Sequence, residues 1–539
     1  MDNKVPASAS TATAALPKPL GGDAAIRLDT SLSRSESRPA RLFVEDPNAP
    51  RDTTITLAFL VLAVAAYVVA RFWRLTSFGL FGDEVFSFWV ADQALPGLID
   101  SVRGDVVHPP LFYLALKCWI AIGGRSILWL KLLPVVFSLA GIPVLVCLCR
   151  ELRMRTAAIS LTFGLMALNA FLVSYAQELR MYSLLMTLSI TSLWLFARLI
   201  NSDAGVARNQ LWLAGVNLFL VFTHYYGWII VALELGFLVI WKRARARAFA
   251  IGVAAIALAF SPWIYAVARE AKEKPARVNF VWNAPPRPSD FAGYYANLNG
   301  ALSYRWKVVG TSLVMILFAT PIIVWGARSL RSSRTQTGQR ASPPIAFWWL
   351  MVFAVGPPVI SFCASYVLTQ SVWAPRYLIV AAPAYFVLVA ASVFELPSKR
   401  FSIAIGSILL AWAVLSGSTD LIDRDRIAWE PLVAEMLHQE PVTNAGINVY
   451  STDPNLGNTI QFYLGRQSRQ RCDAVYVESL RGLPGDHFWV AHIRYKHELG
   501  PSPQQILSES GYEVGAGFEA EAPNHKGFLF PVWKRSGER

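Results

Sequence analysis

A pair of adjacent carboxylates stands near the start of the chain, in the stretch FGDEVFSFWV. Asp83 and Glu84 follow an apolar run that ends near Arg71, and aromatic and aliphatic residues surround them. Acidic side chains close to membrane depth are costly unless they are paired or line a cavity, so both are candidate functional residues. A positioned carboxylate can take a proton from a hydroxyl as a general base, and this is the chemistry we expect here.

Further polar motifs follow at the ends of later apolar runs. They contain His108 in VVHPPL, Glu178, Arg180 and Tyr182 in YAQELRMYSL, His224 and Tyr225 in THYYG, and Arg376 and Tyr377 in APRYL. Arginine and histidine can stabilise the negative charge that develops on a phosphate leaving group. A carboxylate opposite such cations therefore predicts the transfer of a group from a phosphate-linked donor to a hydroxyl.

Five of these residues also have a structural alternative. Asp83 could cap the helix that follows it, and Arg180 could pair with the glutamate two positions earlier or extend to the membrane interface. His224 could be a turn residue whose hydrogen bonds are satisfied, and Tyr182 and Tyr377 suit an aromatic belt at a membrane surface. The expected position of all of them on one side of the membrane favours a common site.

The elements that must hold these residues are membrane-spanning helices. The 539-residue chain is 54% hydrophobic and only 16% charged, and several apolar runs reach the roughly 20 residues that cross a bilayer. The formal net charge of +13 does not indicate nucleic-acid binding, because the basic residues form short clusters between apolar runs, as in cytoplasmic loops. The cysteines show no spacing typical of disulfides or metal sites.

Basic clusters and apolar runs together predict about eleven spans and an all-α membrane domain over residues 51–417. The expected spans cover residues 55–73, 126–149, 157–173, the run that ends at 198, two short arms within 211–241, and then 249–268, 308–327, 345–366, 377–394 and 401–415. Residues 109–123 could form another span or a helix at the outer interface, and the parity of the count favours the interface.

This count places the N-terminus in the cytoplasm and the polar motifs on the outer face. Residues 1–50 lack a continuous apolar core, which predicts a disordered cytoplasmic tail rather than a cleaved signal peptide. From residue 418 the composition becomes that of a soluble protein, with helix and strand patterns that predict a small α/β domain over residues 418–539 on the outer, periplasmic face.

One predicted outer loop, residues 269–305, is unusually basic. It carries Lys272, Lys274, Arg277 and Arg287. Long loops constrain topology less than short ones, so the predicted sides stand. The positive charge could attract an anionic acceptor or lipid headgroup.

The motifs, in their order, resemble those of membrane glycosyltransferases of the GT-C fold. The resemblance covers residues 55–394 and is carried by the acid pair, VVHPPLFYLALK, YAQELRMYSL, THYYG and APRYLIVAAPAY. The chain is similar to the bacterial branch of glycosyltransferase family 39, which is related to protein O-mannosyltransferases, lipid A aminoarabinose transferases and the galacturonosyl transferases of rhizobial lipopolysaccharide. The HPPL that begins at His108 is particularly similar to the VHPPL of protein mannosyltransferases.

The resemblance implies that Asp83 is the catalytic base and that Glu84, at the second acidic position, supports the donor or acceptor site. The implied ligands of the donor phosphate are His108, Arg180 and Arg376, and the implied cavity lining is Glu178, Tyr182, His224, Tyr225 and Tyr377. No cofactor is expected, because similar enzymes are thought to act without metal, although the acid pair leaves room for a divalent ion.

The sequence thus predicts an enzyme of the bacterial inner membrane that transfers a sugar, with inversion, from a polyprenyl-phosphate carrier to an envelope acceptor. It does not distinguish among mannose, aminoarabinose, galacturonic acid, glucose and arabinose, nor among lipid, polysaccharide and protein acceptors. The alternatives are a transporter or flippase of lipid-linked sugars and a membrane scaffold. A transporter is disfavoured because the halves show no strong repeat and the charges gather at one face rather than at mid-membrane.

Overall fold

The computed structural model of the chain describes residues 54–273, 284–301, 309–335, 345–422, 425–440, 446–468 and 472–535, apart from positions 369, 497 and 499. The tail predicted over residues 1–50 lies outside these ranges, as do Lys274 and Arg277 of the basic loop.

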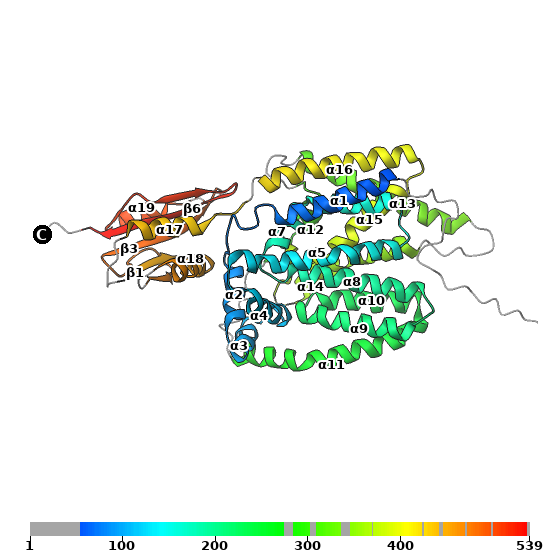
Figure 1. Cartoon of the computed structure of the whole chain (residues 1–539), viewed down its shortest axis with the longest axis horizontal. Helices are drawn as coiled ribbons and strands as arrows, with labels where there is room; N and C mark the ends of the chain where they lie inside the picture. The colour runs from blue at the N-terminus through cyan, green and yellow to red at the C-terminus, as the bar shows by residue number, and fades with distance from the viewer. Residues whose placement is uncertain are drawn as a thin grey trace, which may run out of the picture. The chain divides into compact units, whose positions relative to one another are not determined.

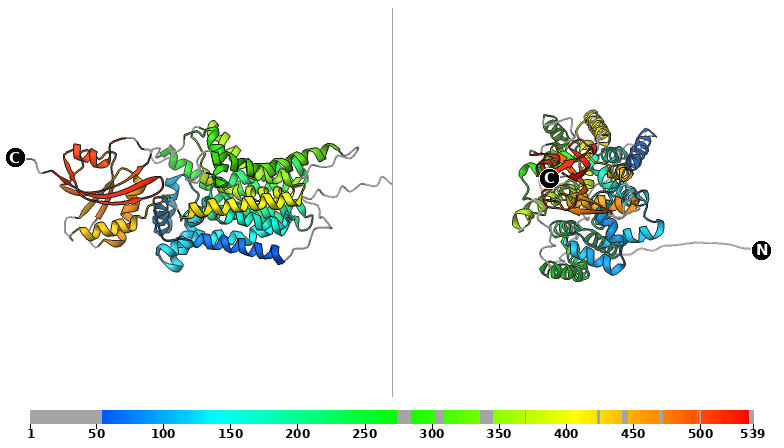
Figure 2. Two further views of the ribbon diagram at one scale, coloured as in Figure 1. Left: turned by 90° about the horizontal axis from the view of Figure 1, so that it is seen from above. Right: turned by 90° about the vertical axis from the view of Figure 1, so that its left-hand side faces the viewer.

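Helices make up the described chain before the C-terminal region (Figure 1; Figure 2). The longer ones are α1 (Thr54–Phe72), α5 (Ile127–Glu151), α8 (Tyr182–Asn201), α9 (Val206–Thr223), α11 (Arg243–Glu273), α13 (Val309–Thr335), α14 (Ile345–Val367) and α16 (Lys399–Ile422). Among the described residues, 7 helices are long and apolar enough to cross a membrane, or up to 8 if one bent pair counts as a single span. The chain is a multi-pass membrane protein, as predicted.

The predicted number of spans is larger than the number of full-length spanning helices. The span expected over 157–173 is the bent pair, α6 (Thr156–Ala167) and α7 (Ala170–Gln177), which meet at 66°. The bend follows from Asn169, whose side chain accepts a hydrogen bond from Leu172 N and so starts a new helix. Helices also occur at the other predicted positions, but α10 (Gly227–Trp241) and α15 (Ala382–Phe394) are shorter than a full span.

Several short elements lie where the sequence predicted a loop or a continuous span, or where it did not distinguish a span from an interfacial helix. The region predicted to be interfacial is the short apolar helix α4 (Leu111–Gly123). A 3₁₀ helix, η2 (Pro375–Val380), precedes α15, where the sequence suggested one continuous span. Part of the predicted basic loop is α12 (Pro288–Leu298).

Three short helices gather at one end of the helical bundle, beside the C-terminal region (Figure 1). They are α4, α2 (Asp83–Asp92) and α3 (Leu95–Asp105). The chain enters α2 through Gly82, which has a φ of 45° and occupies the N-cap position. Glycine tolerates this positive φ, and its place at the cap excludes the alternative in which Asp83 caps the helix.

The C-terminal region is the predicted small α/β fold. Its strands are β1 (Ile447–Ser451), β2 (Cys472–Tyr476), β3 (His487–Tyr495), β4 (Tyr512–Val514), β5 (Phe518–Glu521) and β6 (His525–Lys534), and its helices are α17 (Trp429–Gln439), α18 (Pro454–Gln467) and α19 (Pro503–Glu509). The sheet has the order β2-β1-β3-β6-β4, with β5 also paired to β6. β1 is parallel to β2 and β3, while β6 is antiparallel to β3.

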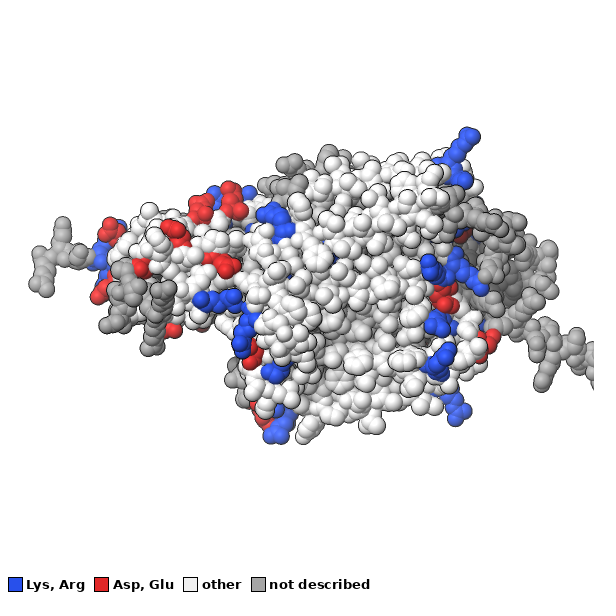
Figure 3. Space-filling model, viewed as in Figure 1, with Lys and Arg blue, Asp and Glu red and all other residues white. Residues whose placement is uncertain are grey.

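Charged side chains gather toward the two ends of the helical bundle, and a broad face without them lies between (Figure 3). This is the distribution expected of helices whose middle lies in lipid. The charged residues of the sequence motifs are therefore expected at the ends of the bundle.

Candidate functional site

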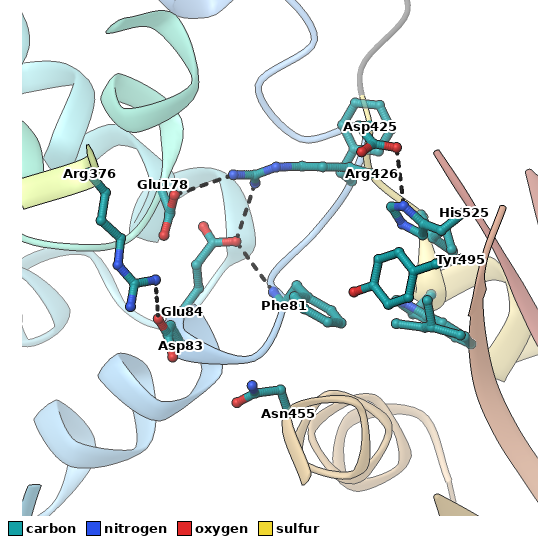
Figure 4. A pocket seen from close by; sticks show the side chains of 14 residues that line it. Phe81, Asp83, Glu84, Glu178, Arg376, Asp425, Arg426, Asn455, Tyr495 and His525 are labelled. Atoms are coloured by element: carbon teal, nitrogen blue, oxygen red, sulfur yellow. Dashed lines mark hydrogen bonds and ion pairs between the residues drawn. The ribbon is translucent and has the colours of Figure 1, made fainter. Parts of the chain in front are cut away.

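A pocket lies where the end of the helical bundle meets the C-terminal region, with a volume of about 330 Å³. Its lining from the bundle is Phe78, Phe81, Asp83, Glu84, Glu178 and Arg376, and its lining from the C-terminal region is Asp425, Arg426, Ile427, Trp429, Asn455, Ile493, Tyr495 and His525 (Figure 4). Four of the residues singled out in the sequence therefore share one pocket.

Asp83 faces two arginines from distant parts of the chain. Its Oδ2 lies 3.4 Å from Arg376 Nη1 and 3.9 Å from Arg180 Nη2, and the side chain is 40% exposed. The positive charge of Arg180, with a smaller contribution from Arg376, holds the pKa of Asp83 below its usual value, although burial opposes this. The carboxylate is therefore ionised at neutral pH and able to accept a proton.

Arg180 is buried behind Asp83. Its Nη1 donates to Asp83 O at 3.2 Å, to Ser87 Oγ at 3.1 Å and to Tyr113 Oη at 3.4 Å. Its Nε has no hydrogen-bond partner within the described residues. The alternative in which Arg180 simply pairs with the glutamate two positions earlier is wrong, because the guanidinium turns toward α2.

His108 is buried beside Arg180, and its Nδ1 lies 3.1 Å from Asp105 Oδ2. Burial, followed by the charge of Arg180, lowers the pKa of His108 well below its usual value. The imidazole is therefore neutral at neutral pH and offers a hydrogen bond rather than a positive charge. Burial also raises the pKa of Asp105 to about 6, against the opposing effect of Arg180.

An aromatic cluster completes the buried side of the site around Tyr377. The Tyr377 ring centroid lies 4.4 Å from that of His224, 5.9 Å from His108 and 6.4 Å from Tyr182. His224 Nδ1 accepts a hydrogen bond from Tyr226 N at 3.1 Å. The neutral ring must then carry its proton on Nε2, an atom that is buried and has no partner within the described part of the chain.

Of the predicted cavity-lining residues, Glu178 lines the pocket, whereas Tyr182, His224 and Tyr377 lie in this aromatic cluster. Tyr225 makes other contacts. Its hydroxyl donates to Val106 O at 3.3 Å and accepts from Trp263 Nε1 at 3.3 Å. The ring of Tyr226 instead lies 5.5 Å from that of Tyr377. Two adjacent tyrosines follow His224, and nothing in the sequence favours the second.

Glu84 has a different environment from Asp83. It is 2% exposed; its Oε1 lies 3.1 Å from Lys131 Nζ, and its Oε2 lies 3.5 Å from Arg426 Nη1. Its Oε1 also accepts from Leu179 N at 2.9 Å. Both carboxylate oxygens are thus engaged, which suits a side chain that holds α2, α5 and the chain before Arg180 together.

Arg426 also contacts Glu178, another acid of the pocket. Its Nη2 lies 3.5 Å from Glu178 Oε2. Burial raises the pKa of Glu178 above its usual value, and Arg426 opposes the rise. The sequence reasoning missed Arg426 and Lys131; Lys131 carried a usable signal, because a charged residue inside a predicted span is a functional candidate.

No group of three or more His, Cys, Asp or Glu side chains is arranged to hold a metal ion within the described ranges. The carboxylates of Asp83 and Glu84 turn to different cations, so the pair does not form a common oxygen site in this arrangement.

Comparison with solved structures shows the fold. The chain is similar to ArnT from Cupriavidus metallidurans bound to undecaprenyl phosphate, with a TM-score of 0.54, 12% sequence identity, and coverage of 89% of this chain and 98% of that one. ArnT from the same organism in the apo state gives a TM-score of 0.52 at 13% identity, covering 88% of this chain and 98% of that one. The chain therefore has the predicted GT-C fold. No family model and no curated protein matches the sequence.

Proposed function

We propose that the protein is a membrane glycosyltransferase that moves a sugar from a polyprenyl-phosphate donor to a hydroxyl of an envelope acceptor. The observation that carries the proposal is the Asp83 carboxylate, which faces Arg376 and Arg180 in a pocket at the end of a membrane bundle. The structure of ArnT bound to undecaprenyl phosphate has the same fold and supports a lipid phosphate as the leaving group.

Asp83 is the proposed general base. With both arginines near it the carboxylate is a weak base, because its pKa is lowered. A donor phosphate that pairs with the same arginines would reduce their effect on Asp83 and add its own negative charge, and both changes raise the pKa of the carboxylate. The base thus becomes effective when the donor is bound, and the acceptor oxygen attacks the anomeric carbon as its proton passes to Asp83.

Arg376 and Arg180 are the proposed ligands of the phosphate. As the bond between the sugar and the phosphate breaks, negative charge accumulates on the leaving phosphate, where preorganised guanidinium groups stabilise it. His108 and His224 are proposed to donate hydrogen bonds from neutral rings, while Tyr182 and Tyr377 shape the apolar wall. Glu84 and Glu178 are proposed to hold the pocket through Arg426.

The proposed setting is the bacterial inner membrane, with the N-terminus in the cytoplasm and the pocket and C-terminal domain in the periplasm. The acceptor is an envelope lipid, polysaccharide or protein, and the basic residues that follow α11 would favour an anionic one. The proposed reaction needs no metal, because the arginines supply the positive charge that the leaving phosphate requires.

The test is mass spectrometry of the envelope from a deletion strain complemented with the wild type, Asp83→Asn or Asp92→Asn at equal expression. Asp92 ends the same helix and pairs with Arg125 at 2.8 Å, so it is a matched control for losing one carboxylate of α2. We expect a sugar-sized mass to disappear on deletion, to return with the wild type and Asp92→Asn, and to stay absent with Asp83→Asn. Full restoration by Asp83→Asn would reject Asp83 as the base.

A further inference from the structure

The chain segment that leads into Asp83 is held by a helix of the C-terminal domain. Leu80 N donates to Tyr463 Oη at 2.8 Å, and the same hydroxyl donates to Leu80 O at 3.1 Å. Leu80 and Tyr463 are both buried. One tyrosine side chain of α18 therefore satisfies both backbone polar groups of a residue three positions before the proposed base.

A second side chain of α18 holds the next backbone donor. Gly82 N, directly before Asp83, donates to Thr459 Oγ1 at 2.8 Å, and that hydroxyl donates in turn to Asn455 O within α18. Thr459 is buried, and its own hydrogen bond fixes the orientation of its hydroxyl. The N-terminus of α2 is thus fixed to the C-terminal domain at successive points.

The backbone of this segment has a positive φ at two residues, and the sequence of the segment alone does not select this conformation. Gly79 and Gly82 have φ values of 61° and 45°. Tyr463 Oη stands directly where a Cβ on Gly79 would lie, so the close approach of α18 requires glycine there. Glycines leave an isolated segment flexible, and it is the contacts with α18 that select one conformation.

Side-chain packing and charge extend the same interface. Phe88 of α2 meets Phe462 of α18 with ring centroids 5.5 Å apart. Arg426, just before α17, reaches Glu84 and Glu178 on the bundle side at 3.5 Å each. The interface therefore restrains both the start of α2 and the side of α2 that faces the C-terminal domain.

We propose that α18 of the C-terminal domain positions the catalytic base, with Tyr463 and Thr459 as positioning residues for Asp83. The proposal rests on the proposed function, because it assigns Asp83 the role of base. It gives the C-terminal domain a part in the chemical step: the domain holds Asp83 against Arg180 and Arg376 and does not serve only to select an acceptor. Neither residue touches the reacting atoms, so each acts through the backbone of the segment.

The distinctive consequence is a separation of kinetic constants. A shift of about 1 Å in a catalytic group can cost on the order of 100-fold in rate. Loosening the segment should therefore lower kcat, by about 10-fold or more for Tyr463→Phe. The arginines that bind the donor come from outside the segment, so KM for the donor should stay within about two-fold. Loss of folding would instead lower the amount of active protein without this pattern.

The experiment compares Tyr463→Phe with Tyr450→Phe in the purified full-length protein. Tyr450 is a matched control, because its hydroxyl also donates to a backbone carbonyl, Pro484 O at 3.0 Å, but on a different face of the same domain. Turnover is measured with undecaprenyl-phosphate sugars as the donor probe and a cell-envelope extract as the acceptor. We expect Tyr463→Phe to lose kcat and Tyr450→Phe to keep it.

Two conservative substitutions of Thr459 distinguish the contribution of its hydroxyl from the contribution of its packing. Thr459→Ser keeps the oxygen that accepts from Gly82 N, whereas Thr459→Val keeps the shape and removes the oxygen. The expected result is near-wild-type kcat for Thr459→Ser and a several-fold loss for Thr459→Val at unchanged donor KM. Wild-type kcat for Thr459→Val would show that the hydroxyl is not needed and would overturn the positioning role of Thr459, as would a loss in Thr459→Ser at least as large as that in Thr459→Val.

Hydrogen–deuterium exchange of a peptide that covers residues 78–84 tests the contact independently of activity. Tyr463→Phe should speed exchange in this peptide by at least about 10-fold, because Leu80 loses its acceptor, and Tyr450→Phe should leave it unchanged. Wild-type kcat together with unchanged exchange in Tyr463→Phe would overturn the proposal. If the wild type turns over none of the donors while exchange responds as expected, the proposed function fails and the contact itself stands.

Discussion

Two sites in the helical bundle that contain carboxylates differ in the partners these carboxylates have. At the end of the bundle, Asp83, Glu84 and Glu178 each lie within 4.0 Å of at least one arginine or lysine. In the middle of the bundle, Glu234 of α10 accepts from Ser192 Oγ at 2.6 Å and from Asn217 Nδ2 at 2.7 Å. Within the described residues, no ion pair involves Glu234.

The difference separates an ionic site from a structural one. Neutral donors satisfy the oxygens of Glu234 and join α8, α9 and α10, but they bring no positive charge that a substrate phosphate could use. The cations around Asp83 both keep the carboxylate ionised and leave it open to a pocket. We therefore assign chemistry to the first cluster and helix association to the second.

The largest expected effect is on the stability of the ionic cluster. Lys131→Met leaves the Glu84 carboxylate with one cation fewer in a site where both side chains are 2% exposed. Removing one partner of a buried pair typically costs about 3–5 kcal/mol. Thermal unfolding of the detergent-purified protein should show a marked fall in Tm, and the double variant Lys131→Met with Glu84→Gln should lose less than the sum of the single variants. Strict additivity would contradict the pairing.

The next effect concerns the proposed phosphate ligands. Arg376→Gln should lower kcat/KM for donor turnover by about 100-fold, because one preorganised group that stabilises the leaving phosphate is lost. Arg125→Gln is the matched control. Arg125 is exposed and pairs with Asp92, which lies at the opposite end of α2 from Asp83. A similar loss in both variants would indicate a general electrostatic effect rather than a phosphate site.

The smallest effect is a dependence of stability on pH. The pKa of Asp105 is raised by burial from 3.8 to about 6, so between these values the folded protein binds a proton that the unfolded chain releases. The contribution of Asp105 to stability should therefore fall as pH rises from about 4 to about 6, by at most about 3 kcal/mol. The lowered pKa of His108 acts in the opposite direction and makes the net change smaller. Asp105→Asn should remove this part of the pH dependence of Tm, and a variant with an unchanged profile would contradict the assignment.

The sequence was informative where one residue or one run of residues carries the signal. Apolar runs and basic clusters located the helices, and motif order indicated the GT-C fold that the structural comparison confirmed. Asp83, Arg180 and Arg376 stood out because charged residues near membrane depth are rare, and the structure places all three together.

The sequence was silent where the signal depends on long-range contacts. Arg426 lies in a segment of ordinary polar composition, and only the packing of the C-terminal domain brings it to Glu84. Tyr463 looks like a buried aromatic of an amphipathic helix until the fold sets its hydroxyl against Leu80. The identity of the inward-facing tyrosine after His224 likewise depends on how the turn before α10 is rotated.

The most direct test of the account measures release of undecaprenyl phosphate from undecaprenyl-phosphate sugars, with a cell-envelope extract as the acceptor. The purified wild type, Asp83→Asn and Glu234→Gln are compared, each confirmed to be folded. Loss of a general base costs about 10²- to 10⁴-fold, so Asp83→Asn should fall by that much. Glu234→Gln should stay within a few-fold of the wild type, because its partners are neutral. Wild-type release by Asp83→Asn, or an equal loss in Glu234→Gln, would contradict the division between an ionic catalytic cluster and a structural one.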